Sequence, residues 1–316
     1  MIELLNVSKV FGEERAVDGI SLTVASGELC VLVGTSGCGK STTLRMINRL
    51  IEHSGGQILI DGHQIRSFNA QVLRRRIGYA IQSTGLFPHW TVARNIGLVP
   101  RLLKWAPARV EARVTELMEL LGLEPALFAD RMPAQLSGGQ AQRVGVARAL
   151  AADPDILLMD EPFGALDPIT RETLQDELLR LQSRLRKTIV FVTHDMDEAL
   201  KLADRIVVMQ RGRIVQQGSP QALLRDPADD FVESLLGGPD RGLKQAALTP
   251  VSALMQAQDQ DLPMGSAASP SVRVDDSLRL ALSLMLWHRR ERLTVIDHTG
   301  RPIGTLSLHD LLGAPQ

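Results

Sequence analysis

The sequence predicts an α/β fold with a largely parallel core sheet, followed by a small α+β unit. Three short, continuously apolar runs lie at Ile156–Met159, Ile189–Val192 and Ile206–Met209. Runs of this kind are typical of strands that are covered on both faces, as in parallel sheets. Over residues 1 to about 236 they alternate with helix-like segments, which is the pattern of one α/β domain.

A helical subdomain is expected to interrupt this sheet at about residues 90–150. Strand signals vanish between Trp90 and Leu150, whereas Val110–Leu121 and Gln140–Ala151 favour helices. We therefore expect these helices to be inserted between strands of the core.

The composition changes after Leu236, where Gly237-Gly238-Pro239 opens a stretch rich in Gln, Ala, Ser and Pro. We expect residues 237–270 to be a linker and residues 271–316 to form a separate small unit. The elements predicted for that unit are a helix from the apolar stripe Leu278, Ala281, Leu282, Met285 and Leu286, strands at Leu293–Ile296 and Pro302–Leu306 joined by a turn at Thr299-Gly300, and a short helix capped by Ser307 and Asp310.

The bulk properties argue against several classes of protein. The 316 residues carry a formal net charge of −1, so the overall basic footprint of a nucleic-acid-binding protein is missing. No apolar stretch approaches the about 20 residues that a membrane-spanning helix needs, and the N-terminus lacks the layout of a signal peptide. Cys30 and Cys38 suggest neither a disulfide framework nor a metal site. We expect a protein of the reducing cytosol.

A phosphate-binding loop is the most specific motif of the chain. Residues 34–41 match the pattern G-x-x-x-x-G-K-[ST], between a strand-like run at Leu29–Val33 and a helix-like segment at Thr42–Leu50. Glycines let backbone N–H groups turn toward a phosphate, Lys40 supplies a positive charge, and the Ser41 hydroxyl can bind Mg²⁺. The motif predicts nucleoside triphosphate binding by Gly34, Thr35, Ser36, Gly37, Cys38, Gly39, Lys40, Ser41 and Thr42.

Two carboxylates end one of the apolar runs. Asp160 and Glu161 follow Ile156–Met159 directly, and a pair of acidic residues next to a core strand needs a chemical reason. We expect Asp160 to help hold Mg²⁺, and Glu161 to accept the proton of, or polarise, the attacking water. The alternative is an acidic strand end that caps the next turn.

The segment Ser137-Gly138-Gly139-Gln140 indicates the class of phosphate-loop protein. Glycines and a serine that open a helix expose backbone donors at its positive end, which is a second phosphate-directed site. In combination with the loop at Gly34 and with Asp160 and Glu161, it makes residues 1 to about 236 resemble the ATP-binding-cassette (ABC) family. The resemblance implies a mostly parallel core sheet, an antiparallel β part, an inserted helical subdomain, and ATP and Mg²⁺ as cofactors.

Four further positions match motifs of that family. The resemblance implies that Phe11 stacks on adenine, although a core role for this ring is an open alternative. It implies that Gln82 contacts Mg²⁺ and the attacking water and links to the membrane partner. It further implies that Asp167 communicates across a dimer and that His194 is the switch histidine at the γ-phosphate. Glu161, His194 and Gln82 are thus the catalytic candidates, and Ser41, Gln82 and Asp160 the candidates for holding Mg²⁺.

The same resemblance implies a head-to-tail dimer. In this family the signature segment of one copy completes the ATP site of the other, so Ser137, Gly138, Gly139 and Gln140 would act in trans. ATP would hold the dimer together, and hydrolysis would loosen it.

The resemblance also indicates which kind of transporter the cassette belongs to. Phe163–Asp167 and Gln140–Val144 look like the importer branch, in which the ATPase is a chain separate from the permease. Gln82–Val92 and Val99–Trp105 are similar to the subgroup that imports glycine betaine, choline or related osmoprotectants. The expected partners are permease subunits that contact the surface around Gln82, a second copy of the chain and, indirectly, a solute-binding protein. The expected location is the cytoplasmic face of the plasma membrane.

Alternatives remain at two points. The cassette could serve another small solute such as an amino acid, act on DNA or ribosomes, or be a sensor that does not hydrolyse ATP. Residues 274–312 resemble one repeat of a cystathionine-β-synthase-type (CBS) domain. Such repeats usually come in pairs, so either a dimer completes the pair or the module is vestigial.

Overall fold

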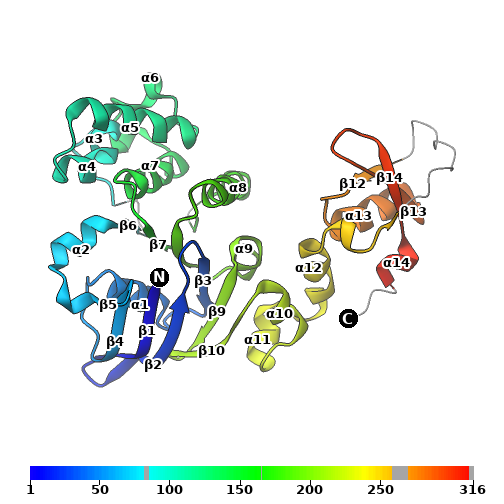
Figure 1. Ribbon diagram of the computed structural model, residues 1–316, viewed down its shortest axis with the longest axis horizontal. Helices are drawn as coiled ribbons and strands as arrows, with labels where there is room; N and C mark the ends of the chain where they lie inside the picture. The colour runs from blue at the N-terminus through cyan, green and yellow to red at the C-terminus, as the bar shows by residue number, and fades with distance from the viewer. Residues whose placement is uncertain (82–84, 165, 258–269, 313–316) are drawn as a thin grey trace. The chain divides into compact units, whose positions relative to one another are not determined.

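The computed structural model describes residues 1–81, 85–164, 166–257 and 270–312. Two compact units are distinguished by their internal contacts, Met1–Pro220 and Gln221–Gln316 (Figure 1). The division lies earlier than the composition change after Leu236, and it groups most of α10 (Pro220–Arg225) and all of α11 (Asp230–Leu235) with the C-terminal unit.

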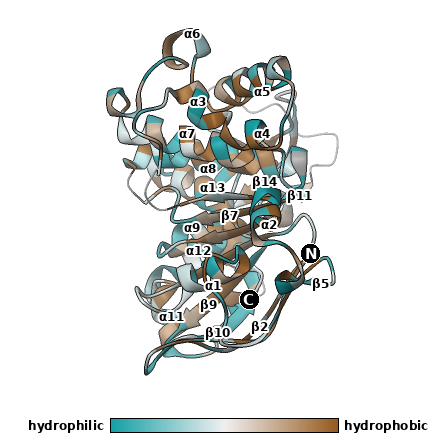
Figure 2. Cartoon of the chain, turned by 90° about the vertical axis from the view of Figure 1, so that its left-hand side faces the viewer, coloured by the Kyte–Doolittle hydropathy of each residue, from teal (hydrophilic) through white to brown (hydrophobic). Residues whose placement is uncertain are grey.

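The first unit is built on a six-stranded sheet in the order β10-β9-β3-β8-β7-β6. All neighbours pair in parallel except β10, which is antiparallel to β9. Every residue of β3, β7 and β8 is buried, which explains their continuous apolar sequences, and the core strands β7 and β9 are largely brown in Figure 2. The strands are β3 (Leu29–Gly34), β6 (Ile77–Ala80), β7 (Ile156–Asp160), β8 (Thr188–Val192), β9 (Arg205–Gln210) and β10 (Arg213–Gly218).

A second, antiparallel sheet has the order β2-β1-β4-β5. Ile2, Leu4 and Val7 of β1 are buried and belong to the same hydrophobic core as Leu32 of β3 and Val190 of β8. One core therefore joins the two sheets. The strands are β1 (Ile2–Phe11), β2 (Glu14–Val24), β4 (Gly55–Ile60) and β5 (His63–Gln64).

Between β6 and β7 the described residues form only helices, which gather at one end of the unit (Figure 1). Val110, Val114 and Leu117 form the buried face of α5 and follow helical spacing. The helices there are α3 (Val92–Ile96), α4 (Leu98–Leu102), α5 (Pro107–Leu120), α6 (Pro125–Phe128), the 3₁₀ turn η2 (Pro133–Gln135) and α7 (Gly138–Leu150). Elsewhere the unit contains α1 (Lys40–Ile47), η1 (Ile65–Ser67), α2 (Ala70–Arg76), α8 (Pro168–Leu185) and α9 (Met196–Leu202).

The C-terminal unit contains a sheet in the order β11-β14-β13-β12. Its small core includes Val272, Ala281, Met285, Val295 and Leu306. The predicted helix and two strands are present, and Ser307 and Asp310 cap the last helix by reciprocal hydrogen bonds of 2.8 and 3.2 Å. The elements are β11 (Gln256–Ala257), β12 (Ser271–Arg273), α13 (Leu278–His288), β13 (Arg292–Ile296), β14 (Pro302–Ser307) and α14 (Leu308–Leu312).

The segment expected to be a linker, residues 237–270, is ordered over much of its described part. It contains η3 (Gly238–Asp240), α12 (Arg241–Leu248), η4 (Val251–Ala253) and β11, and Val251 is fully buried in the core of the C-terminal unit. The composition that suggested a linker includes Ala, Leu, Gln and Lys, which are strong helix formers, so a helix with one apolar side can form there.

Candidate functional site

The phosphate loop connects the end of β3 to the start of α1. Gly34 has φ 150°, and a Cβ atom at this position would collide with the carbonyl oxygen of Met209 on β9. Gly39, the N-cap of α1, has φ 104°, and its Cβ would lie 2.6 Å from the carbonyl oxygen of Ala16. Only glycine fits these two places, because a side chain would meet backbone atoms. Thr35, Ser36 and Gly37, between them, are exposed.

Lys40 is the first residue of α1 and is 5% exposed. Its Nζ donates hydrogen bonds to the carbonyl oxygens of Gly34, at 2.7 Å, and Thr35, at 2.9 Å. It also lies 3.7 Å from Sγ of the buried Cys38. The ammonium group therefore sits within the curve of the loop, where a phosphate group would be bound.

Ser41 and Asp160 meet at the carboxyl end of β7. The Ser41 hydroxyl donates to Asp160 Oδ1 at 2.7 Å, and Asp160 is only 2% exposed. Burial raises the pKa of Asp160, although the hydrogen bond from Ser41 and the nearby Arg45 and Lys40 act in the opposite direction. A hydroxyl oxygen and a buried carboxylate at this spacing fit the hard-oxygen preference of Mg²⁺.

Thr42, next to Ser41 on α1, is half-buried. Among the residues that the structure describes, no group of three or more His, Cys, Asp or Glu side chains could hold a metal ion. A cation bound by Ser41 and Asp160 would thus need further oxygens from bound phosphate or water, as is usual for Mg²⁺ at nucleotide sites.

Glu161 and His194 form a second contact beside this pair. Nδ1 of His194 lies 3.2 Å from Oε2 of Glu161, and the His194 side chain is 62% exposed. Glu161 has φ 45°, and its N–H donates to the carbonyl oxygen of Val192 at 2.9 Å. A positive φ at a non-glycine residue is uncommon and is found preferentially at functional sites. It turns the carboxylate toward His194 instead of continuing the strand.

The segment Ser137–Gln140 opens α7. The hydroxyl of Ser137, the N-cap, accepts from the Gln140 N–H at 3.3 Å, and the Gln140 side chain accepts from the Ser137 N–H at 3.0 Å. These residues line a cavity of about 390 Å³ together with Asp167 and Thr170 of the α8 start. The cavity walls come from α7, α8 and the segments around α6, so this surface is separate from the loop at Gly34.

The remaining predicted residues lie as follows. Phe11 ends β1 and is 47% exposed, and Lys9 Nζ lies 4.6 Å from the centre of its ring. Asp167 is the N-cap of α8 and accepts from the Thr170 N–H at 3.0 Å, and its hydrogen bonds with Thr170 lower its pKa. Gln82 lies outside the described residues.

Sequence reasoning missed a group of polar residues behind His194. A small cavity lined by Glu161 and His194 is also lined by Arg171 of α8 and by Glu198 of α9. Glu198 is 6% exposed, and it lies on a helix whose buried residues are otherwise apolar, namely Met196, Ala199, Leu200 and Leu202. A glutamate among apolar helix positions is the sequence signal that could have indicated it.

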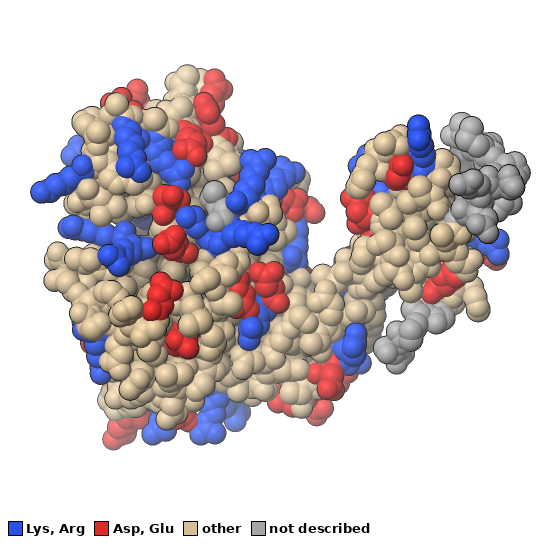
Figure 3. Space-filling model, in the orientation of Figure 1, with Lys and Arg blue, Asp and Glu red and all other residues tan. Residues whose placement is uncertain are grey.

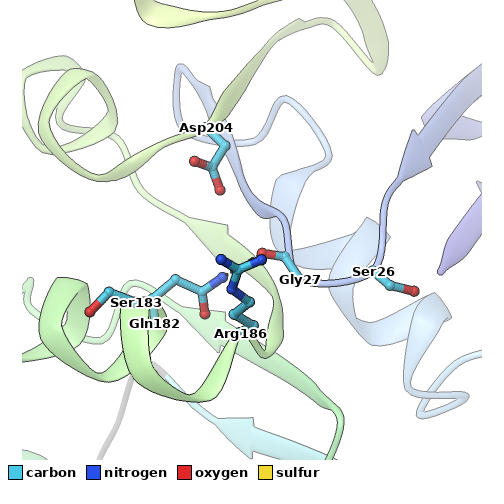
Figure 4. A pocket seen from close by; sticks show the side chains of 6 residues that line it. All are labelled: Ser26, Gly27, Gln182, Ser183, Arg186 and Asp204. Carbon is cyan, nitrogen blue, oxygen red and sulfur yellow. Dashed lines mark hydrogen bonds between the residues drawn. The ribbon is translucent and has the colours of Figure 1, made fainter.

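A larger cavity, of about 460 Å³, lies at the opposite end of the sheet (Figure 4). It is lined by residues that precede β3 and β9 and by the last residues of α8, namely Ser26, Gly27, Gln182, Ser183, Arg186 and Asp204. In open α/β sheets, ligands bind outside the carboxyl ends of the strands. The phosphate loop, Asp160 and Glu161 are at that carboxyl end, so the smaller spaces around them form the candidate site.

A glycine-shaped phosphate loop, the Ser41–Asp160 pair and the Glu161–His194 contact define the site of a phosphate-loop nucleotide hydrolase. The sequence model of one family, described as "ABC transporter", matches residues 17–164. The glycine betaine uptake system ATP-binding protein YehX of Escherichia coli (strain K12) is 52% identical over 99% of both chains. The choline transport ATP-binding protein OpuBA of Bacillus subtilis (strain 168) is 50% identical over 94% of this chain and 76% of its own.

A solved structure of the ATP-binding cassette MJ0796, dimeric and bound to ADP and phosphate in a post-hydrolysis state, matches with a TM-score of 0.64 and 35% identity. It covers 70% of this chain and 99% of that one. The chain belongs to the ATP-binding proteins of the ABC transporter family, and it is an ATPase of that family. None of the described helices combines the length and the apolar character that a bilayer-spanning helix requires.

Proposed function

We propose that this chain is the ATP-hydrolysing subunit of an importer for a quaternary amine of the glycine betaine, choline or carnitine type. The solute would pass through a separate permease. The observation that carries the ATPase role is the pair of contacts Ser41–Asp160 and Glu161–His194 at the end of the sheet. The solute class rests on relatives named for glycine betaine and choline that align along almost the whole chain.

In the proposed mechanism the phosphate loop holds the triphosphate through its backbone N–H groups and Lys40. Ser41, Asp160 and Gln82 would hold Mg²⁺, which would supply positive charge to offset that of the phosphate oxygens. Glu161 accepts a proton from the attacking water, and His194 keeps the Glu161 carboxylate in place at 3.2 Å. Phe11 offers an exposed ring for the base, with the Lys9 ammonium group over that ring.

We assign the segment Ser137–Gln140 to the nucleotide site of a second copy. Its cavity contains Asp167 but no residue of the phosphate loop, so each chain presents two half-sites. The dimer seen in the structure of the similar cassette MJ0796 supports this arrangement. Asp167, at the N-terminus of α8, would then carry information between the two copies.

The permease would contact the surface that follows Gln82. The loop there is held from two directions: Arg148 of α7 donates to the Gly85 carbonyl oxygen at 2.7 Å, and the fully buried Asn95 exchanges hydrogen bonds with Phe87. Phe87 is nevertheless exposed, and its ring packs 4.5 Å from that of Trp90. An exposed aromatic ring on hydrogen-bonded backbone suits a protein interface.

The proposed location is peripheral, at the cytoplasmic face of the membrane that contains the permease, with a solute-binding protein as an indirect partner. Action on nucleic acid is not proposed, since acidic and basic side chains are interspersed on the face of the first unit seen in Figure 3. Residues 271–316, within the C-terminal unit, are proposed to be a single CBS-like repeat.

The test is reconstitution. The chain would be purified with its permease, placed in liposomes, and assayed for ATP hydrolysis and uptake with glycine betaine, choline, carnitine or single amino acids, in the presence of a solute-binding protein. Stimulation by a quaternary amine supports the proposal. Stimulation by an amino acid alone would move the chain to another importer class.

A further inference from the structure

Helices α8 and α9 are joined by three polar links on facing sides. Arg171 Nη1 lies 3.7 Å from Asp195 Oδ2, and Lys201 Nζ lies 2.8 Å from Asp176 Oδ1. Between these partly exposed ion pairs, Gln175 Nε2 donates to Glu198 Oε1 at 3.0 Å. Gln175 and Glu198 are 7% and 6% exposed. Because solvent screens the outer pairs, the buried link is the one that fixes the geometry.

Glu198, at one end of the buried link, lines the same small cavity as Thr193 and His194. Thr193 is held on one side by its N–H, which donates to the Leu32 carbonyl oxygen at 3.1 Å, and its hydroxyl accepts from the Asp195 N–H at 3.0 Å. Asp195 in turn caps α9 by accepting from the N–H groups of Asp197 and Glu198. His194 therefore projects from a short loop whose position depends on where α9 lies against α8.

Glu198 has both polar and charged neighbours. Burial raises its pKa, hydrogen bonds from Thr193 and Gln175 oppose that rise, Asp195 adds to it, and Arg171 opposes it. An amide in place of the Glu198 carboxylate keeps one acceptor oxygen, which is enough for the hydrogen bond from Gln175.

The other end of the same connection is the start of α8. The N–H of Arg171 donates to the Asp167 carbonyl oxygen at 2.9 Å, and its Nη2 donates to the Leu166 carbonyl oxygen at 3.1 Å. The helix thus begins at the residue assigned to communication between two copies and runs, one turn after Arg171, to Gln175.

We propose that Glu198 is a positioning residue for His194, and that its buried hydrogen bond with Gln175 makes the His194 loop move together with the helix that begins at Asp167. This inference rests on the proposed function. A change at Asp167 on dimer formation would be transmitted through α8, Gln175 and Glu198 to the contact between His194 and Glu161.

The test compares variants of the full chain in MgATP hydrolysis. Glu198→Ala is expected to lower kcat by about 10- to 10²-fold, the range for a displaced catalytic group, while KM for ATP stays near the wild-type value because the phosphate loop is untouched. Glu198→Gln should recover most of kcat, since the amide oxygen can still accept from Gln175. The matched control is Thr188→Val, which removes another buried hydrogen bond, from the Gly27 N–H at 3.0 Å, at the far end of the sheet. It should leave kcat unchanged.

A double-mutant cycle with His194→Ala separates positioning from general destabilisation. If Glu198 acts through His194, adding Glu198→Ala to His194→Ala lowers kcat little further. Fully multiplicative losses, a wild-type kcat in Glu198→Ala, or an equally impaired Glu198→Gln would each overturn the inference. Should Glu198→Ala not fold, Gln175→Leu removes the same hydrogen bond from the other helix. A normal kcat in His194→Ala itself would instead contradict the proposed function.

Discussion

The Ser41 hydroxyl donates a 2.7 Å hydrogen bond to Asp160, a residue 119 positions away in the sequence, and thereby joins the first turn of α1 to the end of β7. This contact brings together two of the groups that we assign to Mg²⁺. It also gives a buried carboxylate a partner, which a charge in the core requires.

Asp160→Asn is expected to raise the Mg²⁺ concentration needed for half-maximal hydrolysis by about 10- to 10²-fold, because the amide keeps an acceptor for Ser41 but loses the charge. Titrating ATPase activity with MgCl₂ measures the effect. The control is Asp155→Asn, a fully exposed carboxylate just before the same strand, which should titrate like the wild type. An unchanged requirement in Asp160→Asn would remove this residue from the metal site.

Glu161→Gln should retain ATP and accumulate as a dimer, while turnover falls by about 10²–10⁴-fold, because the amide cannot accept the proton of water. Light scattering with MgATP and a phosphate-release assay measure the two effects. Glu172→Gln, an exposed position on α8, is the matched control. Hydrolysis at the wild-type rate would show that Glu161 is not the base.

The assignment of the signature segment to a second copy predicts complementation. Lys40→Ala and Gly138→Asp should each abolish hydrolysis, and a Cβ at Gly138 meets no atom within 4 Å, so the second change adds charge without disturbing its own chain. Mixed dimers with one chain of each kind contain one intact composite site, so about half of the activity should return. If the signature served its own chain, both sites would be broken and the mixture would stay inactive.

Burial raises the pKa of Cys30 to about 12, so its thiolate is scarce at neutral pH. Reactivity through the thiolate rises with pH until the pKa is reached. At pH 8 the folded chain should therefore leave Cys30 unmodified by iodoacetamide, while guanidinium-unfolded chain is labelled there. Mass spectrometry of the peptides reads this out. Rapid labelling of Cys30 in the folded chain would contradict its buried place in β3.

Deleting residues 241–316 should leave basal ATP hydrolysis at the full-length value, because every residue assigned to the site precedes Arg205. A cut after Val251 would leave this apolar side chain without the rest of the C-terminal core. The cut therefore lies before α12. Circular dichroism controls for folding. A folded product that no longer binds ATP would show that the C-terminal unit contributes to the site.

The fold class and the family were predictable from the sequence because they depend on local patterns. A buried strand, a glycine loop and a helix are adjacent in the chain, so the spacing of Gly34, Gly39 and Lys40 alone specifies how the backbone must curve. The apolar run Ile156–Met159, directly before Asp160, likewise predicted a core strand because its pattern is local. The assigned roles of Glu161, His194, Gln82 and Phe11 remain predictions.

Other features depend on packing that no local pattern records. Gln175 looks like an ordinary polar position of an amphipathic helix, and only the contact between α8 and α9 pairs it with Glu198 in a buried place. Glu161 combines a positive φ with a hydrogen bond of its N–H to Val192 on a neighbouring strand, and neither feature is visible in the sequence. The helix α12 was missed because a composition rich in Ala and Gln suits linkers and helices alike.

The way Lys40 sits in its own loop has a kinetic consequence. The curvature that a triphosphate needs is already built, with the ammonium group anchored by the carbonyl oxygens of Gly34 and Thr35. A nucleotide that binds here meets a loop that already has the required curvature. Binding therefore does not have to order a flexible segment. Association of the nucleotide should therefore be limited by diffusional encounter. The rate of ADP release should then determine how long each chain stays occupied.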